Sequence, residues 1–448
     1  MTHLFVLLPL FALVAVFIFL INLNVKSPIR SVILRSMTVV GVYAVISLEL
    51  LSPLHLVTRP ALIMIWSVPL IAFSVWFLIR RRAGIPIALP ALKFKLGWGE
   101  WLAFSAIAII LLLTAFIAWR APPMTWDSMT YHMSRIAHWA ENQSIGHYIT
   151  GIERQNSMSP GAEMITLHGY LLAGSDRFAS FTEWFAMLGS VIGVSLVARN
   201  MGGRRYAQWL AALFAVSLPM GIVQASSTIT DYVVAFWLVC LAVEVTHYQK
   251  SEDNHAVVFA VLASGMAVLT KPTCIPYLLP LIVWMIVLII RRMKPVIVFK
   301  WAVLAVCLVG LITGGYVARN LTTFGGLSNP IDFQNHVNQL RTPAGFFSNV
   351  LKNAALHAGT PSGHLNNELD ILIRKVHVKI GVDIMDPRTT GDGWFMIRKP
   401  SYSEDMVSNP YHAMAVLLVS IIMLFLIKKM GWSPLLYALC IILSLIHI

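Results

Sequence analysis

The sequence predicts an all-α protein, a polytopic bundle of about twelve transmembrane helices whose outer-face loops carry amphipathic helices. The first observation is composition: the 448 residues are 58% hydrophobic and 12% charged, whereas a soluble domain carries about 25% charged residues. The second is that the apolar residues come in long uncharged runs. The third is that the basic residues gather in every second connection between these runs.

Each predicted span has about the 20 residues that a helix needs to cross a membrane. The first run lacks a preceding basic segment and a small-residue cleavage site, so we interpret it as a retained anchor rather than a signal peptide. The last run ends without a polar flank, which leaves open that the sequence is a fragment of a longer chain. The spans are predicted at residues 4–22, 37–57, 61–79, 101–119, 182–198, 206–223, 231–248, 256–270, 273–290, 298–316, 412–427 and 433–448.

The basic residues predict the orientation, because cytoplasmic loops collect Lys and Arg. One orientation, with the N-terminus outside, satisfies every basic connection. The same asymmetry accounts for the net charge of +13, so we expect membrane lipid and no nucleic acid as a partner. The basic connections carry Lys26, Arg30 and Arg35; Arg80, Arg81, Arg82, Lys93 and Lys95; Arg204 and Arg205; Lys250; Arg291, Arg292 and Lys294; and Lys428 and Lys429.

Two connections are too long to be turns, and the charge pattern places both outside. They run from residue 120 to 181 and from residue 317 to 411. Long loops that gather on one face are common places for function. The four cysteines lie far apart, in or beside apolar runs, which is typical of small buried residues and gives no zinc-binding spacing.

An amphipathic helix is predicted in the first outer loop, beginning near residue 125 after two prolines end the preceding span. Its polar face carries Asp127, Tyr131, Arg135, His138 and Asn142, which recur at helical spacing. Such a helix suits the membrane surface. Its opposite face is apolar and carries Met129, Met133, Ile136, Ala137 and Ala140.

Three carboxylates are candidates for acid–base chemistry, and each has a structural alternative. Asp127 lies on the polar face but could simply favour a helix N-terminus. Glu163 falls in the first turn of a helix that Ser159 and Pro160 predict, so the same alternative applies. Asp231 lies between the sixth and seventh spans, where an ionisable group is a functional candidate or a cap for the next helix.

Several motifs in order along the chain resemble those of a known family. Residues 126–132 (WDSMTYH) and 160–163 (PGAE) are similar to the first outer loop of the GT-C glycosyltransferases. The closer match is the branch of protein O-mannosyltransferases, lipid A aminoarabinose transferases and lipopolysaccharide sugar transferases of the Rgt type. The resemblance covers about residues 100–430, with a departure at the inserted 326–328 (GLS). Further similar elements are 269–271 (LTK), 318–320 (ARN), 324–325 (FG), 329–330 (NP), 404–405 (ED), 409–410 (NP) and His412.

The resemblance implies a bacterial inner-membrane enzyme that moves a sugar from a polyprenyl phosphate to an acceptor hydroxyl outside the cell. The acceptor would be an envelope glycan, a lipid or a protein. Asp127 occupies the position of the catalytic base. Residues 1–100, with three spans, are additional to the usual start, so we expect an N-terminal extension there and a GT-C-like catalytic domain at 101–448.

Basic residues at the outer ends of spans and in the first loop are candidates for holding the donor phosphate. The alternatives are snorkelling to the interface or a solvated face. The phosphate candidates are Lys271, Arg319, Arg135 and Arg154, and the candidates for the pocket of donor and acceptor are Tyr131, His132 and His138.

A divalent cation beside the phosphate is a weaker hypothesis, which rests on Glu404, Asp405 and His412. The alternative is a polar loop. In the second outer loop we predict short helices at 346–357 and 367–380 that pack on the first loop and shape the acceptor site.

Two other functions stay open. About twelve spans also suit a secondary transporter, although we find no repeat between the halves and no buried ion path. An O-antigen polymerase or ligase also uses lipid-linked sugars and long outer loops, but it relies on arginines and a histidine rather than on an aspartate that follows a span.

Overall fold

The computed structural model describes residues 2–23, 28–89, 96–251, 253–327, 338–390, 394–399 and 407–430, and these residues form an all-helical fold without strands. The predicted all-α class is therefore confirmed. Eight helices are long and apolar enough to cross a membrane, which indicates a multi-pass membrane protein. They are Leu4–Ile21, Ile29–Leu54, Arg59–Arg82, Trp98–Arg120, Asp176–Asn200, Asp231–Ser251, Pro272–Arg292 and Pro295–Phe324.

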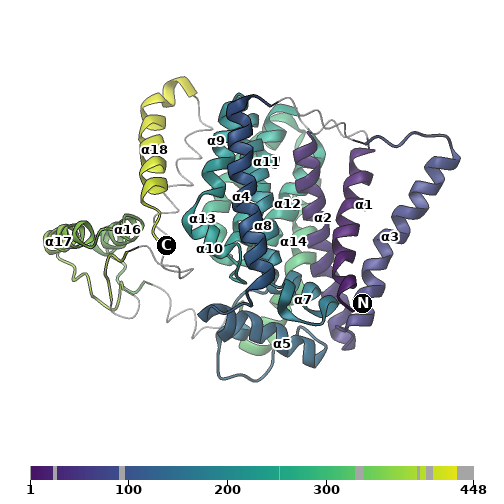
Figure 1. Ribbon diagram of the computed structural model, residues 1–448, viewed down its shortest axis with the longest axis horizontal. Helices are drawn as coiled ribbons and strands as arrows, with labels where there is room; N and C mark the ends of the chain where they lie inside the picture. The colour runs from purple at the N-terminus through teal and green to yellow at the C-terminus, as the bar shows by residue number, and fades with distance from the viewer. Residues whose placement is uncertain are drawn as a thin grey trace.

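Short 3-10 or π-helical turns flank several of the helices. The turns are η1 (Thr2–Leu7), η2 (Ser52–Leu54), η3 (Ser128–His132), η4 (Asp176–Phe178) and η5 (Pro272–Cys274). The α-helices are α1 (Leu8–Ile21), α2 (Ile29–Leu51), α3 (Arg59–Arg82), α4 (Trp98–Arg120), α5 (Met133–Asn142), α6 (Arg154–Ser157), α7 (Gly161–Ala173), α8 (Phe181–Asn200), α9 (Arg205–Val216), α10 (Pro219–Gln224), α11 (Asp231–Ser251), α12 (Asn254–Thr270), α13 (Ile275–Arg292), α14 (Pro295–Phe324), α16 (Pro343–His357), α17 (Gly363–Ile380) and α18 (Pro410–Met430). Figure 1 shows most of the long helices side by side in one bundle, with α16 and α17 apart from it.

The predicted count of about twelve spans is not reached in the described residues. The span predicted at 206–223 is two short helices, α9 and α10, because Pro219 lacks the backbone N–H that would continue α9. Of two further apolar helices, α12 is shorter than the eight spans, and α18 is apolar over Pro410–Leu426. The last predicted span, 433–448, lies outside the described residues.

The centre of the bundle is formed by α2 and α11. In their most apolar stretches, 67% of the residues of α2 and 78% of those of α11 are buried, against 11% for α1 and α3. α2 packs on α7, α8, α12 and α14, so this helix is part of the core of the bundle. Glycine permits the close approach of α8 and α11, because side chains at Gly189 and Gly193 would collide with Phe236 and Val239.

Two ion pairs fix α2 within the bundle. At one end, Arg35 donates to both carboxylate oxygens of Glu244 on α11, at 2.8 and 2.6 Å, and lies 3.0 Å from Asp253. At the other end, Glu49 accepts two hydrogen bonds from Arg319 on α14, at 2.7 and 2.8 Å. Such charges are costly in a membrane unless they are paired, so these contacts help to determine which helices pack on α2.

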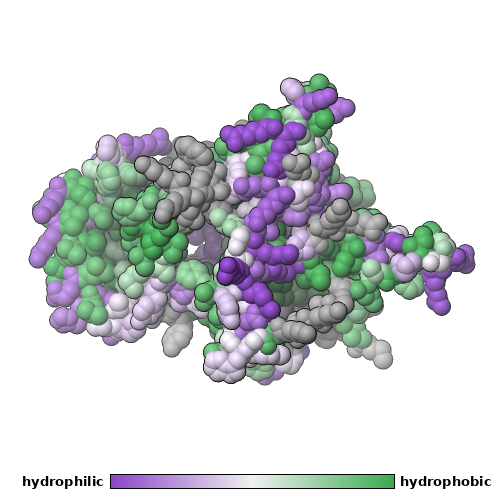
Figure 2. Space-filling model, turned by 90° about the horizontal axis from the view of Figure 1, so that it is seen from above, coloured by the Kyte–Doolittle hydropathy of each residue, from purple (hydrophilic) through white to green (hydrophobic). Residues whose placement is uncertain are grey.

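The two ends of the bundle differ in character. One end carries the start of α2, the end of α3 and the start of α9, where the basic connections lie, and we call it the basic end. Figure 2 looks onto this end and shows hydrophilic side chains across its middle, with hydrophobic side chains beside them. The opposite end carries α5 and α7 (Figure 1), and we call it the loop end.

The second long connection forms a small unit of its own. α16 and α17 pack on each other around Ala355, Ile373 and Phe395. The prediction that these helices pack on the first loop is wrong. α16 contacts α18 instead, where the backbone N–H of Asn409 donates to the carbonyl of His357 at 3.2 Å. In Figure 1 the pair lies beyond α18, away from α5.

Candidate functional site

The first loop begins with a helix that a π-helical turn interrupts. α4 ends at Arg120, residues 126–127 are helical, and the turn η3 leads directly into α5. A π turn inserts one extra residue into the helical repeat, which rotates the side chains that follow it, and such turns are frequent at functional sites. Here the turn lets Tyr131 bond back to Asp127 while His132, the next residue, enters the protein interior.

Asp127 lies at the start of this helix with a phenol and a guanidinium beside it. Tyr131 donates its hydroxyl proton to Asp127 Oδ2 at 2.7 Å, and Arg154 Nη1 lies 3.9 Å from Oδ1. Burial and this hydrogen bond raise the pKa of Tyr131, so the phenol stays a donor. The Asp127 side chain is 22% exposed and that of Arg154 is 40% exposed. A carboxylate with this access can accept a proton from an incoming group.

A second acidic–basic pair adjoins Asp127. Lys271, just after α12, forms an ion pair with Asp231 at the start of α11. Burial would lower the pKa of Lys271, but the charge of Asp231 outweighs it and raises the pKa. The charges of Glu183 and Asp127 also raise the pKa of Lys271, although of these three carboxylates only Asp231 contacts it directly.

Behind the helix lies a buried cluster of three ionisable side chains. His132 Nδ1 donates to Glu163 Oε1 at 2.7 Å, and Arg135 Nη1 lies 3.4 Å from the same oxygen. Burial alone would raise the pKa of Glu163, but the charges of Arg135 and His132 hold it below its usual value. Arg135 also donates to the carbonyl of Arg154 at 3.0 Å. The cluster therefore joins α5, α7 and the loop that carries Arg154.

The sequence motifs of the loops meet in space. Gly161 at the start of α7 lies so close to the end of α12 that an added Cβ would be 2.8 Å from Thr270 Oγ1 and 2.9 Å from the Thr270 nitrogen. In the same region Thr228 donates to Ser128 Oγ at 2.8 Å. These contacts bring the elements of Asp127, Glu163, Asp231 and Lys271 to one place at the loop end. The sequence could not show this proximity, because the four residues are spread from position 127 to position 271 of the chain.

Three predicted site residues lie elsewhere or have another role. Arg319 forms an ion pair with Glu49 and not with Asp127. His138 is exposed and stacks on Tyr148, with ring centroids 4.3 Å apart. His412 bonds to Ser217 at 3.2 Å, in the break between α9 and α10.

In the described part of the chain, no cluster of side chains supports the hypothesis of a metal site. Among those residues, no three His, Cys, Asp or Glu side chains gather where they could hold a metal ion. Glu404 and Asp405, the other two proposed ligands, lie outside the described residues.

The polar face predicted for residues 125–142 is wrong in one respect. Tyr131 and Arg135 are buried, and Arg135 is only 1% exposed, whereas Met129 from the predicted apolar face is 57% exposed. The helix therefore turns much of its polar face toward the protein, where Glu163 neutralises Arg135. The alternative that Arg135 lies on a solvated face is therefore wrong.

Sequence reasoning missed Glu183, which is 1% exposed near the start of α8. It lies against the first turn of α11, close enough to Asp231 and Lys271 for their charges to act on it. The available signal was its position, since a lone carboxylate inside a predicted apolar span is a functional candidate.

Comparisons with known proteins add little about this site. A family model described as a domain of unknown function (DUF8201) matches residues 171–339, which include Glu183, Asp231 and Lys271 but not Asp127 or Glu163. No curated protein and no solved structure matches the chain.

Proposed function

We propose that this protein is a GT-C-type membrane glycosyltransferase with Asp127 as its general base. It would move a sugar from a polyprenyl-phosphate donor to a hydroxyl group, and the loop end would face outward from a bacterial inner membrane. The observation that carries the proposal is the position of Asp127, partly exposed at the loop end, with Arg154 and the Asp231–Lys271 pair beside it.

The carboxylate of Asp127 supplies the base that the reaction needs. As the acceptor oxygen attacks the anomeric carbon, the hydroxyl proton passes to Asp127, and such assistance contributes about 10²–10⁴ in rate. Tyr131, which donates to Oδ2, orients the carboxylate. The other oxygen, Oδ1, faces Arg154 and is the one we assign to the proton.

The leaving group is a lipid phosphate whose negative charge grows in the transition state. Fixed cations that already point at this charge stabilise it without reorganisation. Lys271 is held in place by its ion pair with Asp231. Arg154 is held through its backbone, because its carbonyl accepts a hydrogen bond from Arg135. The buried Glu163 cluster has a positioning role in this scheme, because it connects the Asp127 helix to α7.

The test is turnover of radiolabelled polyprenyl-phosphate sugars by the purified full-length protein in liposomes. The Asp127→Asn variant should bind the donor and lose turnover, and Asp176→Asn, an exposed carboxylate on η4, should remain active. If Asp127→Asn is as active as the wild type, the base assignment is wrong and Asp231 becomes the next candidate.

The same preparations separate an enzyme from a transporter. A transporter would carry a solute into sealed liposomes without consuming a lipid-linked sugar, and Asp127→Asn would be tolerated if this residue only favours a helix N-terminus. Uptake without turnover would therefore reject the transferase proposal.

A further inference from the structure

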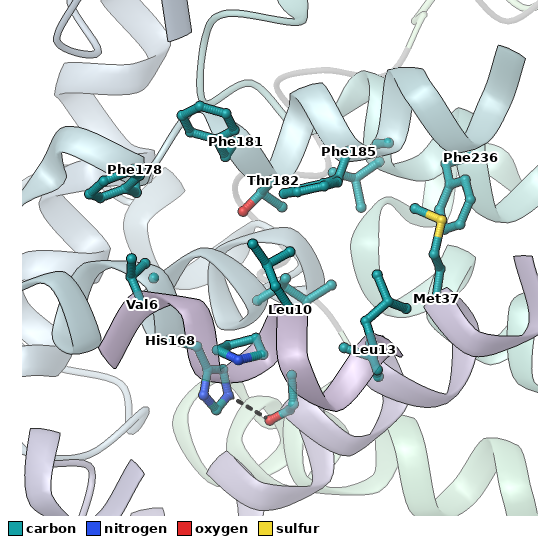
Figure 3. A pocket seen from close by; sticks show the side chains of 18 of the residues that line it. Val6, Leu10, Leu13, Met37, His168, Phe178, Phe181, Thr182, Phe185 and Phe236 are labelled. Atoms are coloured by element: carbon teal, nitrogen blue, oxygen red, sulfur yellow. Dashed lines mark hydrogen bonds between the residues drawn. The ribbon is translucent and has the colours of Figure 1, made fainter. Parts of the chain in front are cut away.

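A cavity of about 280 Å³ lies between α1, α2, α7, α8 and α11. Figure 3 shows its two long walls, with Phe178, Phe181 and Phe185 on one side and Val6, Leu10 and Leu13 on the other. Each set recurs at helical spacing along one face of its helix. The cavity therefore extends along the helices, within the layer that the membrane-spanning segments cross.

The walls are mostly apolar. Of the polar side chains that line the cavity, His168, Thr182 and Trp66 already bond to protein atoms, and the indole N–H of Trp237 is buried. His168 accepts from Trp66 Nε1 at 3.0 Å and donates to the carbonyl of Ala44 at 3.0 Å, while Thr182 bonds to Thr166 at 2.9 Å. Burial lowers the pKa of His168 to about 4, so its ring is neutral. A cavity of this kind stays dry and takes apolar groups.

The cavity lies on the other side of a helical wall from the acidic site. On α11, Asp231 points to Lys271, whereas Val233 and Phe236 line the cavity about half a turn away. The same holds on α7, where Glu163 faces α5 and Ile165 faces the cavity. Asp127, Asp231 and Lys271 do not line the cavity, so we treat it as a site apart from that of the donor phosphate.

A basic side chain marks the end of the cavity at the loop end. Arg59, the first residue of α3, stacks on Phe5 with its guanidinium carbon 5.5 Å from the ring centroid. Phe5 directly precedes Val6, which lines the cavity. A guanidinium in this place suits the phosphate of a lipid whose chain runs inward between the helices.

We infer that the cavity is a second lipid site, which takes one hydrocarbon chain of a phospholipid from the leaflet at the loop end. A water molecule occupies about 30 Å³ of liquid and a methylene group is of similar size, so the space suits on the order of ten methylenes. An empty apolar cavity loses dispersion contacts along its walls, and a chain restores them. The inference does not depend on the proposed glycosyltransferase activity.

The test is photolabelling of the full-length protein in vesicles of phosphatidylethanolamine and phosphatidylglycerol that contain a phospholipid with a chain diazirine. Labelled peptides should come from α1 and the first half of α8. Ala186→Phe, which places a ring in the cavity, should reduce this labelling by about tenfold, as expected for a blocked site. Leu112→Phe on the exposed face of α4 is the matched control and should leave it unchanged.

Two outcomes would overturn the inference. One is labelling that Ala186→Phe does not reduce. The other is labelling by a diazirine-bearing polyprenyl phosphate but not by the phospholipid, which would assign the cavity to the donor chain. If Ala186→Phe does not fold, Leu10→Trp fills the space from α1 and gives the same readout. Asp127→Asn should not alter the labelling, so failure of the transferase proposal stays distinguishable.

Discussion

Replacing Glu163 with glutamine should destabilise the packing of the Asp127 helix on α7. The Glu163 and Arg135 side chains are 2% and 1% exposed, so the variant leaves a guanidinium in the interior without its carboxylate. Removing one partner of a buried pair costs about 3–5 kcal/mol. Arg135 keeps the carbonyl of Arg154 and its stacking on Trp139, so we expect a loss near the lower end, about 3 kcal/mol.

The pH dependence follows from the lowered pKa of Glu163. A carboxyl whose folded pKa lies below its unfolded value of 4.5 contributes stability that is fully present above pH 4.5. This contribution is lost as the pH falls through the folded pKa. Wild type should therefore lose stability in acid more steeply than Glu163→Gln, which has no carboxylate to protonate.

The assay is thermal unfolding of the full-length protein in lipid nanodiscs at several pH values. Glu141→Gln, an exposed carboxylate on α5, is the control and should match the wild type. Removing Arg135 as well should recover part of the loss, because no uncompensated charge then remains. If Glu163→Gln and Glu141→Gln unfold at the same temperature at every pH, the buried cluster does not stabilise the packing of this helix.

Three further outcomes are expected. Gly161→Ala should lower the unfolding midpoint at a cost of about 1–3 kcal/mol, because its Cβ would be 2.9 Å from the backbone nitrogen of Thr270; an unchanged midpoint would mean that α7 can shift. A double-mutant cycle between Arg319 and Glu49 should give a coupling energy of about 0.5–3 kcal/mol, since they share two hydrogen bonds; additive effects would contradict the pairing. Burial lowers the pKa of Lys352 from 10.5 to about 8. The unfolded chain therefore binds more protons than the folded one between these pH values, and stability should rise with pH across that window. Lys352→Met should flatten this slope, and a slope that persists in the variant would assign it to another group.

Composition and charge were enough to predict the helical class, because a membrane requires long apolar helices and the sequence shows them directly. The predicted bounds are close to the structure for Leu4–Ile21 and Trp98–Arg120. They are wrong where a local feature overrides hydropathy. Ile29–Leu54 begins eight residues before its predicted start at 37, since the polar first turns of α2 are buried against other helices, as Arg35 is against Glu244.

The candidate site was predictable by residue type but not by pairing. Asp127 and Asp231 are visible in the sequence as carboxylates near span ends, and Glu163 as a carboxylate in the first turn of a helix predicted by Ser159 and Pro160. The partners come from distant segments, as in Lys271–Asp231 and Arg319–Glu49, so local patterns could not assign them. The prediction from periodicity is also wrong at the π turn, because a regular helical repeat places Arg135 on an exposed face.

The central position of α2 has a consequence for biosynthesis. Arg35 finds Glu244 only 209 residues later, and Glu49 finds Arg319 only 270 residues later. At about 5–20 residues per second, these partners emerge roughly 10–50 s after α2. During that interval the nascent helix carries two unneutralised charges, one near each end, and ionisable side chains in a membrane are costly until they are paired. α2 therefore completes its contacts only after α11 and α14 have been made, and ribosomal stalling before α14 would leave it exposed to quality-control proteases.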